Sequence, residues 1–333
     1  MNLGWRTLGL LGALVAACLL PFLLSDYRIF QLTLVMVYAI ALLGLNILTG
    51  FNGQFSLGHG AFYAIGAYTA AILMAHYQVP YWATLPAAAV VCLGAGFLFG
   101  LPALRLEGLF LALATLSLAV AMPSILKYRG IAELTGGVQG LVLFKPDAPA
   151  FFVKAGLPLN QDQWLYFFTL AVTIVMFVLA WNLLRGRVGR AIVAIRDQPI
   201  AARAMGINAA MYKSLTFGVG ALYAGVAGAL GAIAIQFVAP DSFQVGLSFV
   251  FLIGAVIGGI YSISGAVFGA FFVLFVPHIS EGISRAAPQA IFGAFLIAFM
   301  FVMPVGIAGF LRLASAWARR RTHRSSHVTG EAP

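Results

Sequence analysis

Long uninterrupted runs of apolar residues limit the folds open to this chain more than any other feature. A helix needs about 20 mostly apolar residues to cross the roughly 30 Å hydrocarbon layer of a bilayer. The runs are continuous, whereas the strands of a membrane β-barrel alternate apolar and polar residues. We therefore predict an all-α polytopic membrane helix bundle with about ten transmembrane helices, at residues 8–24, 29–49, 61–78, 82–101, 108–126, 163–184, 214–238, 246–260, 264–280 and 289–311.

The composition agrees with lipid as the main solvent of this surface. Hydrophobic residues make up 62% of the 333 positions and charged residues only 8%, with a mean hydropathy of +1.01. A soluble domain carries about 25% charged residues, because water must solvate its surface. The composition therefore excludes a chain of soluble domains, and membrane lipid is its first expected partner.

The basic residues indicate which way the bundle faces. Cytoplasmic segments of membrane proteins are enriched in Lys and Arg. If the N-terminus lies in the cytoplasm, thirteen of the 19 basic residues and three of the nine acidic residues fall on that side. The N- and C-termini are therefore predicted to be cytoplasmic. The net charge of +10 is first a topology signal and then an attraction to anionic lipid, so no nucleic acid partner is expected.

The runs and the polar segments between them divide the chain. We predict a membrane domain at residues 1–312 and a basic, disordered cytoplasmic tail at 313–333. The longest connections are a cytoplasmic loop at about 185–213 and an outer, extracytoplasmic loop at about 127–162. The outer loop is either a docking surface for a partner or a passive connection, and the residues leave both interpretations open.

Several kinds of chemistry are missing from the sequence. No Lys follows a Gly, so the chain lacks the loop that cradles ATP phosphates. The predicted spans hold almost no ionisable residues away from their ends, which argues against a proton-coupled carrier. The sequence offers no metal motif and no cluster of acid, base and nucleophile. We expect no enzyme, no metal and no cofactor in this chain, but a pathway whose energy comes from a partner.

The cytoplasmic loop predicts two short helices. The first covers 187–196, with Val188, Ile192 and Ile195 on one face. Pro199 suits the first position of the second helix, and Gly206 suits its end. Two basic helices at an angle could insert into a groove on a partner or lie on anionic lipid. The residues alone do not decide between these two.

The same loop carries a family resemblance. The stretch 187–208, followed by Tyr212 and Lys213, resembles the cytoplasmic coupling loop of branched-chain amino-acid ABC transporter permeases. Its Ala-Ala-x-x-x-Gly segment is similar to part of the general ABC permease coupling motif, although Ile200 replaces the acidic residue that opens that motif. The resemblance covers residues 30–312 and is closest to the LivM-type subunit. Further matching stretches lie at 48–60, 102–108, 112–116, 134–140 and 303–309.

The resemblance implies a function and a set of partners. It implies a permease subunit in the bacterial inner membrane that imports branched-chain amino acids. This subunit would assemble with a LivH-type permease, with two cytoplasmic ATPase subunits that bind the ATP, and with a periplasmic binding protein. The alternatives are a urea or short-chain amide importer of the same family and a stand-alone channel or facilitator. The residues implied to couple to the ATPase are Arg187, Val188, Arg190, Ile192, Ile195, Arg196, Ala201, Ala202 and Gly206.

Polar residues at a break between two apolar runs are candidates for the translocation path. Asn52-Gly53 is a turn signal, and irregular backbone within a membrane must face protein or water. The competing interpretation is an ordinary turn in solvent, and hydroxyl groups in a span commonly bond back to their own helix. The candidate path residues are Gln54, Ser56, His59, Thr115 and Ser117.

Glycine patterns predict close packing near the C-terminal end. Gly254-x-x-x-Gly258 and Gly265-x-x-x-Gly269 place small residues on one helix face, which lets helices approach closely. A second pattern is a short internal similarity, in which 53–57 and 259–263 share the form Gly-x-aromatic-Ser-aliphatic. It reflects either duplicated halves, as in many transporters, or chance.

Overall fold

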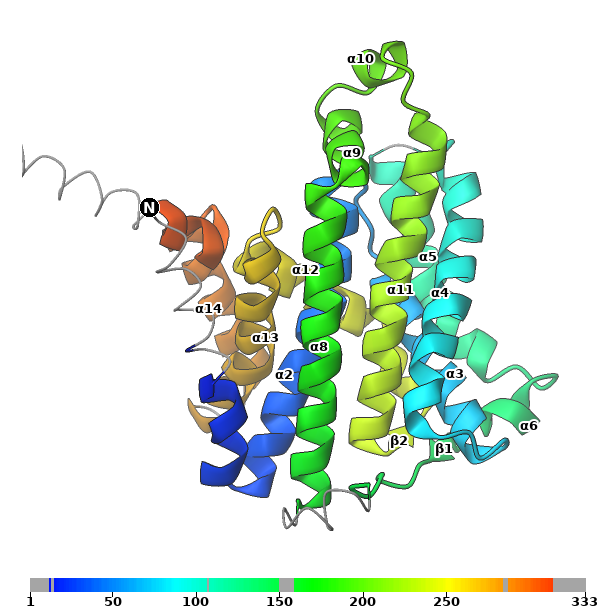
Figure 1. Cartoon of the computed structure of the whole chain (residues 1–333), viewed down its shortest axis with the longest axis vertical. Coiled ribbons are helices and arrows are strands. Elements are labelled where there is room, and N and C mark those ends of the chain that lie inside the picture. Colours follow the sequence, from blue (N-terminus) through cyan, green and yellow to red (C-terminus); the bar gives the residue numbers. More distant parts are fainter. Residues whose placement is uncertain (1–11, 13–14, 107, 150–158, 284–286, 314–333) are drawn as a thin grey trace, which may run out of the picture.

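A computed structural model of the whole chain describes residues 12, 15–106, 108–149, 159–283 and 287–313, and these form an all-α bundle (Figure 1). Only β1 (Leu141–Val142) and β2 (Phe237–Val238) are strands among them. Residues 15–23 and 306–313 are helical. The other helices are α2 (Asp26–Leu45), the π-helix η1 (Asn46–Phe51), α3 (His59–Ala75), α4 (Tyr81–Ala103), α5 (Leu109–Leu126), α6 (Ala132–Thr135), α8 (Gln161–Arg185), α9 (Arg187–Asp197), α10 (Pro199–Ala204), α11 (Ala209–Ile235), the 3-10 helix η2 (Pro240–Phe243), α12 (Val245–Gly258), α13 (Ile263–Ile283) and α14 (Pro288–Val302).

The predicted apolar runs correspond to helices. Within the described ranges, seven helical segments are long and apolar enough to cross a membrane, and α3 and α12 are shorter apolar helices. The all-α fold is therefore confirmed. In the predicted run at 8–24, residues 15–23 are helical, and residues 8–11 and 13–14 lie outside the described residues. The predicted tail lies outside them from residue 314 onward. The number of spans and the side on which the termini lie stay predictions.

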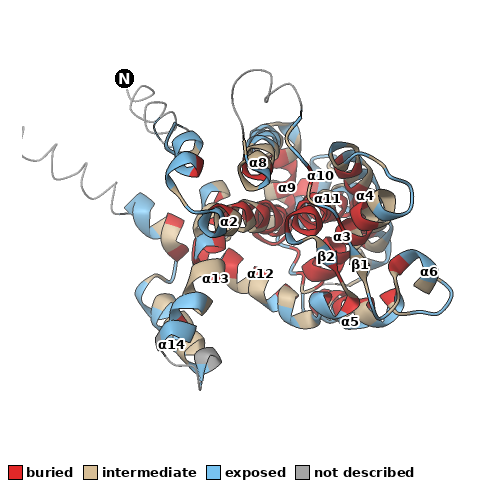
Figure 2. Cartoon of the chain, turned by 90° about the horizontal axis from the view of Figure 1, so that it is seen from below, coloured by how far each residue is buried: buried red, intermediate tan, exposed pale blue. Residues whose placement is uncertain are grey.

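Two helices form the centre of the bundle. The apolar stretches of α11 and of α2 with η1 are 83% and 78% buried, against 17% for α8 and 6% for the segment containing α14 (Figure 2). Glycines allow α3 and α11 to meet closely. A Cβ on Gly66 would lie 2.1 Å from the carbonyl oxygen of Gly225, and one on Gly228 would lie 1.9 Å from that of Tyr63. Because only hydrogen atoms fit there, the backbones themselves make the contact.

The predicted glycine packing of the C-terminal part is confirmed. α12 and α13 face each other through the four glycines of the two motifs. A Cβ on Gly258 would lie 2.0 Å from the carbonyl oxygen of Gly265, and one on Gly269 would lie 2.1 Å from that of Gly254. Such close approach lets dispersion contacts between backbones stabilise a helix pair in lipid.

The two ends of the bundle carry different structures. α9 and α10 project from one end, and α6, β1 and β2 lie at the other (Figure 1). The strands pair antiparallel, with Leu141 opposite Val238 and Val142 opposite Phe237. The region that we predicted simply as an outer loop, 127–162, therefore contains a short helix and a strand, and it is joined to the segment that follows α11.

Candidate functional site

The hairpin formed by α9 and α10, named here the α9–α10 hairpin, begins with a sharp change of direction after α8. Gly189 makes it possible, because a Cβ there would lie 2.1 Å from the carbonyl oxygen of Leu184. Pro199 occupies the first turn of α10, and Gly206 follows its end with φ of +82°. That φ suits glycine, which has no Cβ to clash. The two predicted helices and both of their boundary signals are confirmed.

The apolar face of α9 packs on the protein's own bundle. Ile192 and Ile195 are buried and Val188 is half-buried, and α9 contacts α8, α11 and η1. Ala202 of α10 is buried beside Ile195 and Ala209. The chain itself therefore covers this apolar face, which the spacing of the apolar residues did not indicate. Whether the hairpin meets a partner or lipid stays a prediction that concerns its other, exposed side.

The outer side of the hairpin is exposed. Arg187 and Arg190 of α9 and Ala201 of α10 are exposed, as is Gly206. Two apolar side chains at the tip, Ile200 and Met205, are 80% and 83% exposed. An apolar tip beside basic residues is the kind of surface that a protein partner covers. On contact, the apolar side chains leave water and the basic groups can pair with acidic groups of the partner.

Four of the five candidate path residues lie buried around the turn between η1 and α3. Gln54, Ser56, His59 and Thr115 are all buried. The backbone N–H of Leu57 donates to Thr115 Oγ1 at 2.9 Å, which attaches the turn to α5. The interpretation of these residues as a solvent-exposed turn is wrong, because α5 and the helices beside it cover them.

The side chains of Gln54, Ser56 and His59 each have a polar partner within the protein. His59 Nε2 lies 2.8 Å from the carbonyl oxygen of Ala41, and its ring meets Phe251 edge-on with centroids 6.0 Å apart. Ser56 Oγ accepts from the N–H of Gly58, and Gln54 Oε1 accepts from Asn52 Nδ2. The contacts of His59 join α3 to α2 and α12, and the bonds of Ser56 and Gln54 fix the turn itself, so these residues shape the break between helices.

Ser117 differs from the other four candidates. It is exposed on α5, near Leu113 and Val120, which are 48% and 58% exposed. Its Oγ donates to the carbonyl oxygen of Leu113, and Thr115 Oγ1 donates to that of Ala112. Both hydroxyl groups thus bond back to their own helix, as the sequence indicates.

A groove of about 240 Å³ lies where the polar turn meets the α9–α10 hairpin. It is lined by residues from the turn, the hairpin and the starts of α5 and α11, among them Asn52, Gln54, Arg196, Pro199 and Lys213. Both sides of this groove carry residues that the sequence marks as candidates, on one side for the path and on the other for coupling. Their meeting is a long-range contact that no local pattern predicts.

Sequence reasoning missed the π-helix η1 and its partner. Asn46 in η1 donates from Nδ2 to the carbonyl oxygen of Ser262 at 3.0 Å, although 216 positions separate the two residues. π-helical turns are rare and are found frequently at functional sites. The internal similarity between 53–57 and 259–263 was the one sequence signal that pointed to this contact, because Ser262 belongs to the second of these segments.

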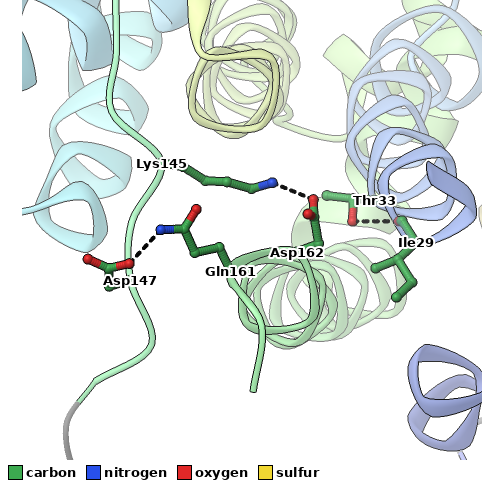
Figure 3. Close-up of polar contacts among 6 residues, drawn as sticks. All are labelled: Ile29, Thr33, Lys145, Asp147, Gln161 and Asp162. Carbon is green, nitrogen blue, oxygen red and sulfur yellow. Dashed lines mark hydrogen bonds and ion pairs between the residues drawn. The ribbon is translucent and has the colours of Figure 1, made fainter. Parts of the chain in front are cut away.

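Ion pairs and hydrogen bonds attach the connection between α5 and α8 to the bundle; we call this connection the outer segment, after the side predicted for it. Lys145 pairs with Asp162 at the start of α8, and Gln161 donates to Asp147 at 2.6 Å (Figure 3). Lys127 pairs with Asp241 at 2.6 Å. The surface so held carries exposed apolar side chains: Tyr128, Val138, Val142 and Phe144.

Comparison with known proteins assigns the chain to a class. Residues 27–304 match the family described as branched-chain amino acid transport system / permease component. The chain belongs to this permease family. The predicted resemblance is thus confirmed, and the family is one of transport proteins, not of enzymes. No solved structure matches the permease.

Individual relatives agree with the family. The permease is 31% identical to the high-affinity branched-chain amino acid transport system permease protein LivM of Salmonella typhimurium (strain LT2), over 91% of this chain and 75% of that protein. It is 27% identical to LivH of Escherichia coli (strain K12), with 83% and 92% covered. It is 31% identical to the autoinducer 2 import system permease protein LsrC of Salmonella paratyphi B, with 55% and 53% covered. The chain is a membrane permease subunit of an ABC importer.

Proposed function

We propose that this permease is the LivM-type subunit of a bacterial inner-membrane importer for branched-chain amino acids. The extent of its similarity to LivM supports this substrate class. Its partners would be a LivH-type permease, two cytoplasmic ATPase subunits and a periplasmic binding protein. The ATPase subunits would bind the ATP, and this chain would carry no cofactor. A urea or short-chain amide importer of the same family is the alternative, since the relative LsrC is named for a different substrate.

The exposed tip of the α9–α10 hairpin is the observation that carries the proposed coupling. We assign contact with an ATPase subunit to its exposed residues, which are Arg187, Arg190, Ala201 and Gly206. The apolar residues Val188, Ile192, Ile195 and Ala202 attach the hairpin to the bundle. A force on the tip therefore reaches the bundle through packed side chains and not through a flexible linker.

The proposed arrangement in the membrane follows the charges. The permease domain would be 1–312, with about ten transmembrane helices, both termini in the cytoplasm and a basic tail at 313–333. The hairpin end would be cytoplasmic, and the end carrying β1 would be periplasmic. The exposed apolar side chains of the segment 127–162 then suit docking of the binding protein.

We place the translocation path along the exposed face of α5. Ser117, between Leu113 and Val120, gives this face one hydroxyl among apolar side chains. Such a surface suits the passage of an apolar amino-acid side chain with weak binding. Gln54, Ser56, His59 and Thr115 would support the path from behind, because they fix the turn that packs against α5.

Reconstitution with the neighbouring subunits tests this function. Met205→Asp places a carboxylate at the apolar tip, and we expect it to lower the amount of co-purified ATPase about tenfold or more. Tyr77→Asp, at a 65% exposed position at the other end, is the control and should retain the ATPase. Vesicles holding the wild-type importer should accumulate leucine only with ATP.

Each alternative has its own result in that experiment. Uptake of urea or acetamide in place of leucine would support the amide importer. ATP-independent leucine flux, with no ATPase bound to the wild-type permease, would support a stand-alone facilitator. Full retention of ATPase by the Met205→Asp variant would contradict docking at the tip.

A further inference from the structure

The two similar sequence segments share two structural features, a glycine with positive φ and a serine that accepts from a following backbone N–H. Gly53 and Gly259 both have positive φ, +73° and +110°, which side chains with a Cβ rarely adopt. Ser56 Oγ accepts from the N–H of Gly58, and Ser262 Oγ accepts from that of Gly265. Each segment is thus a glycine turn followed by a serine that bonds the start of the next helix. We call the turns 50–57 and 259–263 the paired turns.

The paired turns are packed directly against each other. A Cβ on Gly50 would lie 1.9 Å from the carbonyl oxygen of Ile260, so the two backbones are in contact. The hydrogen bond from Asn46 to Ser262 joins the same two regions. Since close-packed backbone cannot deform continuously, a displacement of one turn must displace the other.

One side chain of the α9–α10 hairpin contacts both turns. Arg196 Nη1 donates to the carbonyl oxygen of Gly50 at 3.1 Å, and its guanidinium carbon lies 5.2 Å from the ring centroid of Tyr261. Its aliphatic stem fills the space above Gly53, where a Cβ would lie 2.8 Å from Arg196 Cγ. Asp197 Oδ1 accepts from Arg196 Nε at 2.8 Å and fixes the plane of the group.

These contacts need an arginine. Its planar group offers five N–H donors in a fixed fork and a face that stacks on aromatic rings. It therefore bonds a carbonyl, pairs with a carboxylate and lies near a ring at the same time. A lysine, as a compact point charge on a flexible stem, would keep the carbonyl or the carboxylate but not the whole set.

The turn that Arg196 holds is suited to rearrangement. It begins with the π-helix η1, and the buried oxygen atoms Asn46 Oδ1, Thr49 Oγ1 and Asn52 Oδ1 have no hydrogen-bond partner among the described residues. Buried polar atoms in native proteins nearly always have partners. A segment that leaves three unpaired is held in this form by its surroundings, and a different register could pair them.

We propose that Arg196 is a positioning residue that transmits movement of the α9–α10 hairpin to the paired turns, and so to the helices α3 and α13 that follow them. This inference rests on the proposed function, because the ATPase subunits supply the movement. The hairpin, Arg196 and the two turns form one mechanical unit. Docking alone does not require the contact between Arg196 and the second turn.

The test uses the importer assembled from all its subunits in lipid vesicles, with leucine as the probe. Arg196→Met keeps the aliphatic stem and removes the guanidinium. We expect leucine uptake per ATP hydrolysed to fall about tenfold, with ATPase still bound. Arg196→Lys should recover part of this ratio. Arg105→Met removes the same charge at an exposed position near the same end and should keep the wild-type ratio.

A second pair of variants tests the other turn without threatening the fold. Tyr261 is 61% exposed, so its replacement should not unfold the protein. Tyr261→Phe keeps the ring face and should transport normally, whereas Tyr261→Leu should lower uptake per ATP severalfold. An unchanged ratio in both Arg196→Met and Tyr261→Leu would overturn the proposal, as would a proportional fall of uptake and hydrolysis. A wild-type permease that binds no ATPase would instead refute the proposed function.

Discussion

Gly258 shows how a single hydrogen atom at one position can decide whether two helices pack. Gly258→Ala would force a methyl group to within 2.0 Å of the Gly265 carbonyl oxygen, and overpacking of this kind costs about 1 to 3 kcal/mol. We expect a lower melting temperature of the purified permease in detergent. Gly94→Ala is the matched control, since a Cβ there meets nothing within 4 Å. That variant should be neutral or slightly stabilised, because alanine is the better helix former.

Single residues also show the limit of local patterns. Gly206 and Pro199 could be assigned from sequence, because a helix end is decided by the conformations that those residues allow. Arg196 could be placed in the loop but not against Gly50, which lies 146 positions away. Its contacts depend on how α9 packs against η1. A basic residue in a loop gives no local sign of which carbonyl it will meet.

The outer segment is held to the bundle by a small number of contacts, so its order should depend on them. Lys145 and Asp162 are only 18% and 25% exposed, and a hydrogen bond between charged groups contributes about 1.5 to 3 kcal/mol. Lys145→Met should therefore raise amide hydrogen exchange over 141–149 and weaken docking of the binding protein. Arg129→Met, an exposed charge on the same segment, is the control. Equal exchange in both variants would mean that β1 and β2 alone hold the segment.

Some elements could be predicted closely and others not at all. The runs at 108–126 and 163–184 differ by at most two residues from α5 and α8, because hydrophobicity alone determines them. The run at 214–238 begins five residues after the start of α11, which follows the cap Asn208, whose side chain accepts from Met211 N. The charged Lys213 interrupts the apolar pattern there, so the pattern did not indicate the first turn of the helix. β1 and β2 escaped prediction because two-residue strands carry no alternation to detect.

At the scale of the whole molecule, composition predicts that the chain forms membrane helices but not how these helices are arranged. Apolar runs predict that helices cross a membrane, but lipid and protein are equally apolar neighbours. The sequence therefore could not show that α11 is central and α14 peripheral. Glycine content is the partial exception, because α11 carries the glycines that its neighbours need for close approach. The same holds for the candidate site: the polar turn and the α9–α10 hairpin were each predicted from sequence, but the contact between them was not.

The orientation of the bundle gives the last prediction, which follows from the asymmetry of its charges. Cys18 and Cys92 are first replaced by alanine, and then one cysteine is introduced at the hairpin tip, Met205→Cys, or in the outer segment, Phe144→Cys. These positions are 83% and 89% exposed. If basic residues hold the hairpin end in the cytoplasm, an impermeant maleimide should label position 144 in spheroplasts and position 205 only in inverted vesicles. The reverse pattern would show that the bundle is inverted, and labelling of both from one side would refute an arrangement in which these two ends face opposite compartments.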